Sequence, residues 1–249
     1  MMTKVILITG GGRGIGAACA LQAAEQGYRV CINYLADERA ARGVVDAIAA
    51  RGGVAMAIKA DVSDERQVEA MFRTVDDAHG RLDALVNNAG VLSQQMRVEQ
   101  MSAARIHRIM ATNVVGSMLC AREAVKRMSL RHGGPGGAIV NVSSRAGVLG
   151  AAGEYVDYAA SKAAMDALTV GLSKEVAGEG IRVNGVRPGL IHTDMHASGG
   201  EPERVARLAG SVPMGRGGQP SEVAHAILWL LSDAASYTTG SFIDVSGGR

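Results

Sequence analysis

The sequence has few aromatic residues, little net charge and no long apolar run. Aromatics make up only 3% of its 249 residues, so we expect a core packed mainly with Ala, Val, Ile, Leu and Met. The net charge of +2 is too small to argue for nucleic acid or an anionic membrane as a partner. No stretch approaches the ~20 apolar residues that a membrane-spanning helix needs. The sequence therefore gives no indication of nucleic-acid binding or of a membrane span.

Cysteine is also scarce, and no metal-binding pattern is present. Cys19, Cys31 and Cys120 have neither disulfide-like nor metal-ligand spacing, so we expect reduced core residues of a cytoplasmic protein. His192 and His196 are four residues apart, but the zinc-protease Glu and a third ligand are missing. We therefore expect no metal. The N-terminal apolar run is too short for a signal peptide and leads straight into glycines, which indicates a strand.

Short apolar runs alternate with helical segments along the whole chain. Strands are expected at residues 4–9, 29–34, 54–60, 82–87, 139–142, 181–186 and 241–245, and helices at 15–26, 37–51, 63–79, about 102–132, 156–172 and 221–232. Continuous apolar strands separated by helices indicate a parallel sheet covered on both faces. The sequence thus predicts an α/β, single-domain Rossmann fold over residues 1–249, with a doubly wound seven-stranded parallel sheet and helices on both faces.

Two segments depart from this regular alternation. Ser63 is expected to cap the helix that follows it, because Asp64 and Glu65 then occupy its first turn. Residues 192–218 form a polar insert with two glycine pairs. Such an insert is more often a lid or substrate loop than packed scaffold.

A glycine-rich segment, Thr9-Gly10-Gly11-Gly12-Arg13-Gly14-Ile15-Gly16, lies between the first strand and the first helix. Glycines let the backbone approach a pyrophosphate, and the helix N-terminus offers free N–H groups. A tight turn without a ligand is the plainer alternative. The segment lacks Gly-Lys-Ser/Thr, so a nucleotide triphosphatase loop is disfavoured.

Tyr158 and Lys162 are four residues apart in a helical pattern and therefore share one face. A nearby ammonium favours phenolate, so we expect Lys162 to lower the Tyr158 pKa from its ordinary ~10. Such a tyrosine exchanges protons with an alcohol or carbonyl near neutral pH. Ser144, at the end of an apolar run, is placed to join them. A surface Tyr and Lys at this spacing by chance is the alternative that the pair alone leaves open.

Taken together, the motifs resemble the short-chain dehydrogenase/reductase family, including its carbonyl reductases and 3-oxoacyl reductases. The motifs are Thr9-Gly10-x-x-x-Gly14-x-Gly16, Asn87-Asn88-Ala89-Gly90, Asn113, Ser144, Tyr158-x-x-x-Lys162 and Pro188-Gly189-x-Ile191-x-Thr193. They span essentially the whole chain, in the family's order. The resemblance implies an oxidoreductase that interconverts a carbonyl and a secondary alcohol by hydride transfer with a nicotinamide cofactor.

The resemblance also implies four catalytic residues. Tyr158 acts as the general acid or base, Lys162 lowers its pKa and bonds the nicotinamide ribose, and Ser144 donates a hydrogen bond to the substrate oxygen. Asn113, a poor residue for a helix interior, holds a water that relays protons to Lys162; a merely tolerated polar residue is the alternative. Ser143 points the opposite way in an extended segment, and the family pattern matches Ser144.

The cofactor preference depends on the end of the second strand. Family members that prefer NAD carry an acid there, bonded to the ribose 2′-OH. Asn33 and Tyr34 occupy this place, and Arg13 is placed to pair with a 2′-phosphate, so NADP(H) is favoured over NAD(H). Asp37, three residues further on, is the one group that argues against this choice. The alternatives are an NAD(H)-dependent sugar or polyol dehydrogenase and a cofactor-binding member of the family without turnover.

The expected cofactor contacts combine the glycine loop, the strand ends and the later motifs. Asp61 is expected to edge the adenine, or else only to flank a helix beside Ser63, and Thr193 to hold the nicotinamide carboxamide. The full set is Gly10, Gly12, Arg13, Gly14, Ile15, Gly16, Asn33, Tyr34, Asp61, Val62, Asn87, Ala89, Gly90, Tyr158, Lys162, Pro188, Gly189, Ile191 and Thr193.

The substrate pocket is expected to be polar. Ser93, Gln94, Gln95, Arg145 and Tyr155 should shape it together with residues 192–218, which suggests a small oxygenated substrate such as a sugar or a ketoacyl group. Tyr155 has no Lys four residues later and is expected to be a lid or packing residue. Arg145 either contacts an acidic substrate or is solvated. The resemblance implies a homotetramer, built through the long helix, the Tyr158 helix and the C-terminal strand.

Overall fold

A seven-stranded parallel sheet forms the centre of the molecule in the computed structural model, which describes residues 3–249. Met1 and Met2 of the expected domain lie outside the described residues. The strands are β1 (Val5–Ile8), β2 (Arg29–Tyr34), β3 (Val54–Lys59), β4 (Ala84–Asn87), β5 (Gly137–Val142), β6 (Ile181–Pro188) and β7 (Phe242–Val245). All neighbours pair in parallel, in the order β3-β2-β1-β4-β5-β6-β7. The predicted fold class is confirmed.

The strand order places a crevice at the centre of the sheet. The chain starts in the middle at β1, winds outward to β3, and then returns to β4 on the other side of β1. The segments that leave β1 and β4 therefore run in opposite directions, which opens a crevice at the carboxyl ends of the strands. Ligands of open α/β sheets bind at such a point.

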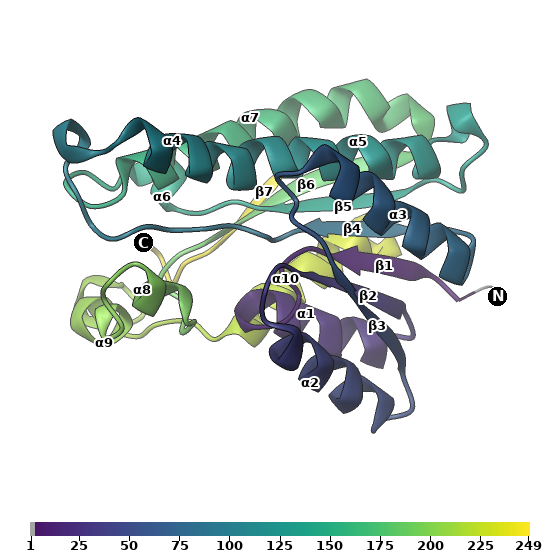
Figure 1. Cartoon of the computed structure of the whole chain (residues 1–249), viewed down its shortest axis with the longest axis horizontal. Coiled ribbons are helices and arrows are strands. Elements are labelled where there is room, and N and C mark those ends of the chain that lie inside the picture. The colour runs from purple at the N-terminus through teal and green to yellow at the C-terminus, as the bar shows by residue number, and fades with distance from the viewer. Residues whose placement is uncertain (1–2) are drawn as a thin grey trace.

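Helices cover both faces of the sheet. One face carries α1 (Gly14–Glu25), α2 (Glu38–Ala49) and α10 (Pro220–Leu231), and the other carries α3 (Glu65–His79), α4 (Ala103–Met110), α5 (Gly116–Met128) and α7 (Val156–Val176) (Figure 1). Shorter helices are α6 (Ala146–Leu149), α8 (Met195–Ser198) and α9 (Arg204–Leu208), and 3₁₀ turns occur at Val98–Gln100, Leu130–His132, Ala177–Glu179, Ala209–Ser211 and Asp233–Ala235. Among the described residues, no helix is both long and apolar enough to cross a membrane.

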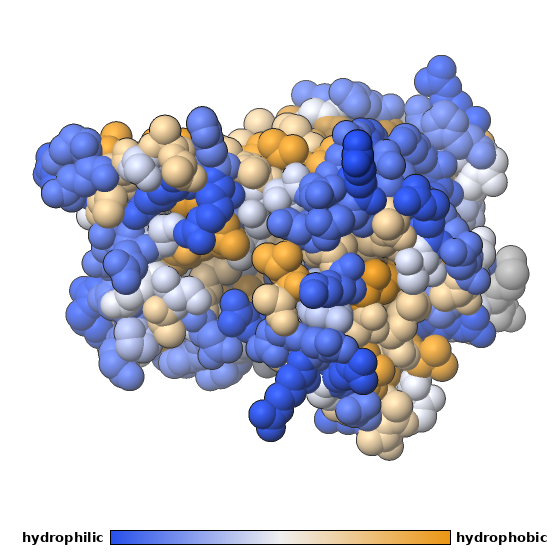
Figure 2. Space-filling model, in the orientation of Figure 1, coloured by the Kyte–Doolittle hydropathy of each residue, from blue (hydrophilic) through white to orange (hydrophobic). Residues whose placement is uncertain are grey.

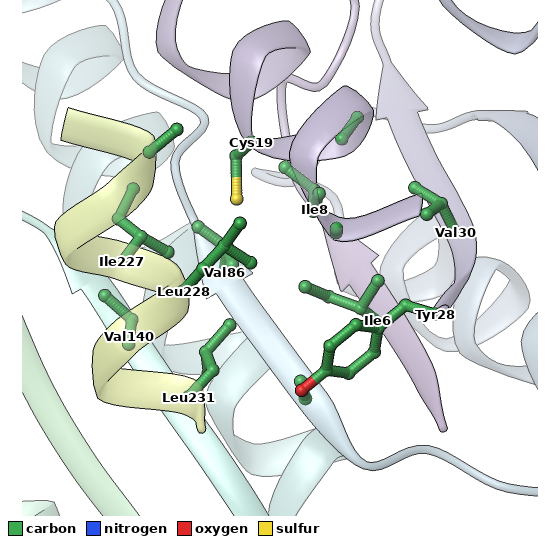
Figure 3. Packing of buried hydrophobic residues seen from close by; sticks show 14 of the residues in the cluster. Ile6, Ile8, Cys19, Tyr28, Val30, Val86, Val140, Ile227, Leu228 and Leu231 are labelled. Carbon is green, nitrogen blue, oxygen red and sulfur yellow. The ribbon is translucent and has the colours of Figure 1, made fainter. Parts of the chain in front are cut away.

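The core is aliphatic, as the scarcity of aromatics predicts. Ile6 and Ile8 of β1 pack with Cys19 of α1 and Ile227 of α10, all fully buried (Figure 3). Phe72 of α3 is the largest fully buried side chain. The three cysteines are free and buried, and burial raises the pKa of each thiol to about 12. They are therefore unreactive core residues.

The stretch expected as one long helix at 102–132 is interrupted. After α4 the chain forms a π-helical turn, Ala111–Val115, before α5 begins at Gly116. π-Turns inside helices are frequent at functional sites, and this one contains Asn113. Gly116 packs so closely on Val62 that an added Cβ would lie 2.9 Å from the Val62 carbonyl oxygen, which holds the turn against the end of β3.

The expected cap of the third helix was wrong by one residue. Asp64, not Ser63, is the N-cap of α3, and its carboxylate accepts from the Gln67 backbone N–H at 3.1 Å. The Ser63 hydroxyl instead donates to Asp61 Oδ1 at 2.7 Å. The ionised Asp64 carboxylate is a stronger acceptor for the N-terminal N–H group than a serine hydroxyl.

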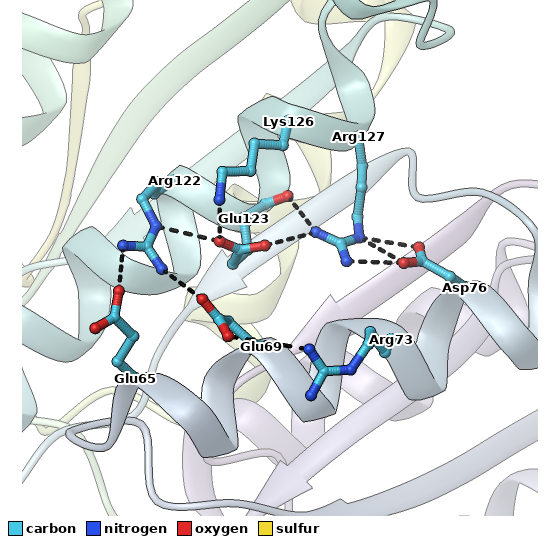
Figure 4. Close-up of polar contacts among 8 residues, drawn as sticks. All are labelled: Glu65, Glu69, Arg73, Asp76, Arg122, Glu123, Lys126 and Arg127. Atoms are coloured by element: carbon cyan, nitrogen blue, oxygen red, sulfur yellow. Dashed lines mark hydrogen bonds and ion pairs between the residues drawn. The ribbon is translucent and has the colours of Figure 1, made fainter.

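Charged residues join α3 to α5 on the outer surface (Figure 4). Glu123 is nearly buried and contacts Arg122, Lys126 and Arg127 at 3.1, 2.7 and 2.9 Å. Arg127 also pairs with Asp76 of α3 at 2.7 Å. A shared network of this kind orders long side chains more than isolated surface pairs do. It holds α5, and with it the π-turn, in a fixed place over the sheet.

Candidate active site

The glycine loop forms a backbone cradle between β1 and α1. Gly10 has φ +62°, and a Cβ added to it would lie 3.0 Å from Ala89 Cα. A Cβ at Gly16 would lie only 2.4 Å from the Gly10 carbonyl oxygen. Thr9 Oγ1 accepts from the backbone N–H groups of Asn88 and Ala89 at 3.0 Å. The loops after β1 and β4 are therefore tied together, and side chains are excluded where an anion meets the start of α1.

A cavity of about 980 Å³ extends from this cradle across the ends of the strands. The space-filling view shows a recess on this face, between the end of α4 and the α8–α9 segment (Figure 2). Most predicted cofactor contacts line the cavity, namely Gly10, Gly12, Arg13, Gly14, Ile15, Asn33, Tyr34, Asp61, Val62, Ala89, Gly90 and Thr193. An elongated cavity that begins at a glycine cradle fits a dinucleotide.

Two predicted cofactor contacts line neither cavity of the site, and a third is almost fully buried. Asn87 lines neither cavity, because its Nδ2 donates to Ser117 O and to Asn141 Oδ1 inside the fold. Gly16 also lines neither cavity and acts through the close approach described above. Asn33 lines the larger cavity but is 2% exposed; its Oδ1 accepts from Gly10 N and its Nδ2 donates to Ala60 O. The two asparagine side chains therefore brace the sheet and the loop.

A second cavity, of about 170 Å³, contains the expected catalytic end. Ser144, Tyr158 and Lys162 line it, together with Pro188, Gly189, Ile191 and Thr193. Ile15, Asn88, Leu92, Thr193 and Met195 line both cavities. The two cavities therefore form one continuous cleft, with the glycine cradle in one part and Tyr158 in the other.

The two adjacent serines after β5 point to different partners. Ser143 is 2% exposed, and its hydroxyl donates to the Lys162 backbone carbonyl at 3.0 Å. Ser144 lines the smaller cavity together with Tyr158, and its Oγ accepts from Ala146 N at 3.1 Å where α6 begins. The side chain that faces the tyrosine is therefore that of Ser144, as the alternation of an extended segment predicts.

The expected lowering of the Tyr158 pKa by Lys162 is not found in the structure. Lys162 Nζ donates to Val142 O at 2.7 Å and lies 5.7 Å from the centre of the Tyr158 ring. Burial raises the Tyr158 pKa to about 12, although the neighbouring Ser144 hydroxyl acts to lower it. Burial also lowers the Lys162 pKa to about 8, opposed by the charge of Asp166. The Tyr158 pKa is therefore raised where a lowering by Lys162 was expected, because loss of hydration is the largest influence on the phenol.

Asn113 is fully buried in the π-turn and lines neither cavity. Its Oδ1 accepts from Val91 N at 2.8 Å, and its Nδ2 donates to Val91 O and to Ser161 Oγ. A Cβ added to Gly90 would lie 3.4 Å from Asn113 Oδ1 and 3.6 Å from Lys162 Nζ. Asn113 thus holds the segment after β4 against α7, next to the Lys162 ammonium. The expected proton relay stays a prediction.

The segment 192–218 is held over the smaller cavity by polar contacts. The Tyr155 hydroxyl donates to Gly199 O at 3.2 Å, and the Arg204 guanidinium lies 5.2 Å from the Tyr155 ring centre. Arg204 is 8% exposed and pairs with Glu154 and Glu201. Gln95 Nε2 donates to Glu201 Oε2 at 2.6 Å. Tyr155 is therefore a packing residue, as expected.

Arg145 and His196 are occupied by contacts within the protein. Arg145 pairs with Asp244 at 2.6 Å and donates to the Arg249 carbonyl at 2.7 Å, so it joins the end of β5 to the C-terminus. His196 contacts Ile191 O at 2.8 Å. Within residues 3–249, no group of three or more His, Cys, Asp or Glu side chains is placed to hold a metal.

Several residues of the cleft were missed by the sequence reasoning. Asn88 and Leu92 line both cavities, and Arg108 of α4 lines the larger one. Asn88 stands in a motif that was recognised, so its position was the available signal. Arg108 carries no local signal, because only the folding of distant segments brings it to the cleft.

Known proteins resemble the chain over its whole length. A family model described as enoyl-(acyl carrier protein) reductase matches residues 10–249. The uncharacterized oxidoreductase YgfF of Escherichia coli is 60% identical over 98% of this chain and 99% of its own. The 3-oxoacyl-[acyl-carrier-protein] reductase FabG of Staphylococcus aureus is 38% identical over 99% of this chain and 98% of its own.

A solved structure agrees with the sequence comparisons. The 3-ketoacyl-(acyl-carrier-protein) reductase of Brucella melitensis, complexed with NADH, superimposes with a TM-score of 0.92 at 32% identity, covering 100% of this chain and 98% of that one. The similarity therefore extends over the full length of the chain, including the cleft that joins the glycine cradle to Tyr158. The chain belongs to the short-chain dehydrogenase/reductase family and is an oxidoreductase that uses a nicotinamide cofactor.

Proposed function

We propose that the protein is an NADP(H)-dependent oxidoreductase that interconverts a carbonyl and a secondary alcohol, acting chiefly as a carbonyl reductase. One observation carries the proposal: Tyr158, Ser144 and Lys162 line one end of a cleft that continues to the glycine cradle. The nicotinamide cofactor supplies or accepts the hydride when it is bound. The protein has to bind the substrate, exclude water and manage one proton.

In the proposed reduction, Tyr158 donates its phenolic proton to the carbonyl oxygen as the carbonyl carbon gains the hydride. Ser144 donates a hydrogen bond to the same oxygen and stabilises the charge that develops on it. Because burial raises the Tyr158 pKa to about 12, the phenol is protonated at neutral pH, which is the form that a reductase needs. Lys162, hydrogen-bonded to Val142 O, places a positive charge beside the phenolate that remains.

The proposed preference for NADP(H) has support in the larger cavity. Arg13 is exposed, lines the cavity, and has no carboxylate partner in the described part of the chain. Asn33 is buried and neutral, so no acid stands at the end of β2. Asp37 lines the same cavity, but its Oδ1 accepts from Ala40 N at 2.9 Å as the cap of α2.

The cofactor proposal is tested by steady-state kinetics with both reduced cofactors. We expect kcat/KM with NADPH to exceed that with NADH by at least about tenfold, because a guanidinium bonded to a phosphate contributes ~1.5–3 kcal/mol. A clear preference for NADH would contradict the proposal and assign Asp37 to the ribose 2′-OH.

We propose a 3-oxoacyl group or a similarly small oxygenated carbonyl compound as substrate. Its support is the relationship to 3-oxoacyl reductases and the size of the cavity at Tyr158, about 170 Å³. The test follows NADPH absorbance with a panel of 3-oxoacyl thioesters, simple ketones and ketoses. Turnover of the sugars alone would favour a polyol dehydrogenase, and no turnover with intact cofactor binding would favour a binding protein.

Two further features belong to this proposal. Residues 192–218 act as the lid of the substrate cavity, supported by the contacts of Tyr155 and Arg204 with that segment. The protein assembles as a homotetramer through α5, α7 and β7. Exposed apolar side chains support this assembly, namely Val115 at the end of the π-turn, Met118 on α5 and Val170 on α7.

A further inference from the structure

We propose that an arm of the larger cavity beside α4 binds a carboxylate or phosphate at the distal end of the substrate. This α4 arm consists of Ser93, Gln94, Arg105 and Arg108. The proposal rests on the proposed reductase function and adds the charge of the substrate to it. Its basis is an arginine that faces the cavity without a carboxylate partner, next to a buried hydroxyl that still has a proton to donate.

The α4 arm is a continuation of the cleft that holds Tyr158. Leu92 lines both cavities, and Ser93 follows it directly in an extended segment. Met195 also lines both cavities, and Ser198 of the same short helix, α8, lines the larger one. A substrate with its carbonyl at Tyr158 therefore passes Leu92 and Met195 before it reaches Ser93.

Two arginines stand in the arm, and only one of them is neutralised. Arg105 pairs with Asp157 at 2.7 Å and donates to Gln94 O at 2.6 Å; its side chain is 10% exposed and that of Asp157 2%. Arg108 is exposed, and within residues 3–249 the one hydrogen bond of its side chain runs from Nη2 to Ser93 Oγ at 2.6 Å. Arg105 therefore supports the wall, while Arg108 leaves its charge and most of its donors open to the cavity.

Ser93 and Arg108 together match an anion in geometry. Ser93 Oγ accepts from Arg108, and no described residue accepts the Ser93 proton. Because Ser93 is 9% exposed, its hydroxyl is held in place at the wall. A guanidinium fork beside a hydroxyl donor suits the oxygens of a carboxylate or a phosphate, and a cation at a cavity wall raises the local concentration of anions.

The carboxylates of the same cavity lie elsewhere. Asp37 caps α2, and Asp61 accepts from the backbone and the hydroxyl of Ser63. Asp194, at the start of α8, lines the opposite wall and makes no ion pair with Arg108 within the described residues. The positive charge of the α4 arm is therefore not cancelled.

Thr112, one turn after Arg108, lines the same cavity as the glycine loop. The experiment must therefore distinguish binding of the substrate anion by Arg108 from binding of the cofactor by Arg108. Three 3-oxobutanoate esters of equal length serve as probes, ending in a methyl group, a carboxylate or a phosphate. For each protein variant, KM is measured with the three esters, and the cofactor dissociation constant is measured by fluorescence. The variant is Arg108→Gln, which keeps hydrogen-bond donors but removes the charge.

For the unaltered protein we expect KM for a charged ester to be at least about tenfold below that for the neutral one, since a hydrogen bond to a charged group gives roughly this factor. Arg108→Gln should bring this ratio close to one, with the cofactor dissociation constant unchanged. Arg108→Lys should give an intermediate ratio, because it keeps the charge without the fork. The charged ester whose KM lies further below that of the neutral ester shows whether the preferred anion is a carboxylate or a phosphate.

The matched control is Arg97→Gln, an exposed arginine that pairs with Glu99 outside the cleft; it should keep the ratio of the unaltered protein. An unchanged ratio in Arg108→Gln, or weaker cofactor binding without a change of ratio, overturns the proposal. If none of the esters is reduced, the reductase assignment fails separately. Calorimetric titration with the charged and neutral esters then still reports the ratio, because it needs no turnover.

Discussion

Single residues of the cleft show how strongly burial controls protonation. Tyr158 and Lys162 sit one helical turn apart, as the spacing predicts, yet their pKa values move in the direction that loss of hydration imposes. Burial keeps the Tyr158 phenol neutral, and it weakens the affinity of the Lys162 amine for its proton. The proposed reduction therefore starts from a protonated Tyr158.

Replacing Tyr158 with Phe tests the proposed proton donor. General acid catalysis contributes about 10²–10⁴-fold, so kcat should fall by this factor or more. The cofactor dissociation constant should stay within about twofold, because the ring is retained. Stopped-flow or steady-state NADPH oxidation measures the first quantity, and cofactor fluorescence the second. Full activity in Tyr158→Phe would exclude Tyr158 as the acid.

In the proposed mechanism, the charge of Lys162 sets the pH dependence of carbonyl reduction. Burial lowers its pKa to about 8, so its positive charge is present below that pH and lost above it. We expect kcat/KM for carbonyl reduction to fall as the pH rises above about 8. Asp166 raises the Lys162 pKa, so Asp166→Asn should move this fall to lower pH. The control Asp46→Asn, on the exposed face of α2, should leave the profile unchanged; an equal shift in both variants would contradict the assignment.

At the scale of elements, close backbone contacts position the ligand-binding loops. The glycine loop, the segment after β4 and the start of α1 meet where a Cβ at Gly16 would lie 2.4 Å from the Gly10 oxygen. The π-turn fixes the segment after β4 in the same way, because Asn113 hydrogen-bonds the backbone N–H and the carbonyl of Val91. Such contacts cannot relax independently, because each joins two elements of the sheet's carboxyl edge.

Gly16→Ala is therefore expected to push the glycine loop away from α1. The dissociation constant of the cofactor should rise by at least about tenfold, and the free energy of unfolding should fall by ~1–3 kcal/mol, the usual effect of overpacking. Titration and urea denaturation measure the two effects. Gly43→Ala is the matched control: its added Cβ meets nothing within 4 Å in α2, so it should stabilise the protein by ~0.5–1 kcal/mol. Normal cofactor binding by Gly16→Ala would exclude the cradle as the anion site.

At the scale of the whole molecule, the two helical layers have different tasks. The layer of α1, α2 and α10 completes the larger apolar cluster. The layer of α4, α5 and α7 carries Tyr158 and Lys162, and also exposes Val115, Met118 and Val170. Scattered apolar side chains are common on monomers, so the assembly has to be measured.

Met118→Glu tests the proposed tetramer. A charge introduced into an apolar interface costs several times RT unless it is paired, so the variant should dissociate to dimers or monomers of the 25.7 kDa chain. Size-exclusion chromatography with light scattering measures the mass, and circular dichroism verifies the fold. Val98→Glu, equally exposed but outside α5, α7 and β7, should remain tetrameric. A monomeric unaltered protein would refute the assembly.

The amino-acid sequence by itself determined the α/β class, the parallel sheet, the glycine loop and the helical pairing of Tyr158 with Lys162. Each of these depends on local spacing or on the apolar pattern of one segment, which the chain carries before it folds. For the same reason, Ser144 was correctly placed opposite Ser143.

Only the tertiary structure decided the protonation of Tyr158, the internal hydrogen bonds of Asn87, the ties that hold Arg145 and Arg204, and the open charge of Arg108. These properties depend on which distant groups exclude water or supply a partner. Asp157 neutralises Arg105 from a position 52 residues away, while Arg108, one turn further along α4, has no carboxylate partner among the residues described. No pattern within one helix separates the two arginines, because hydration and pairing are set by contacts across the fold.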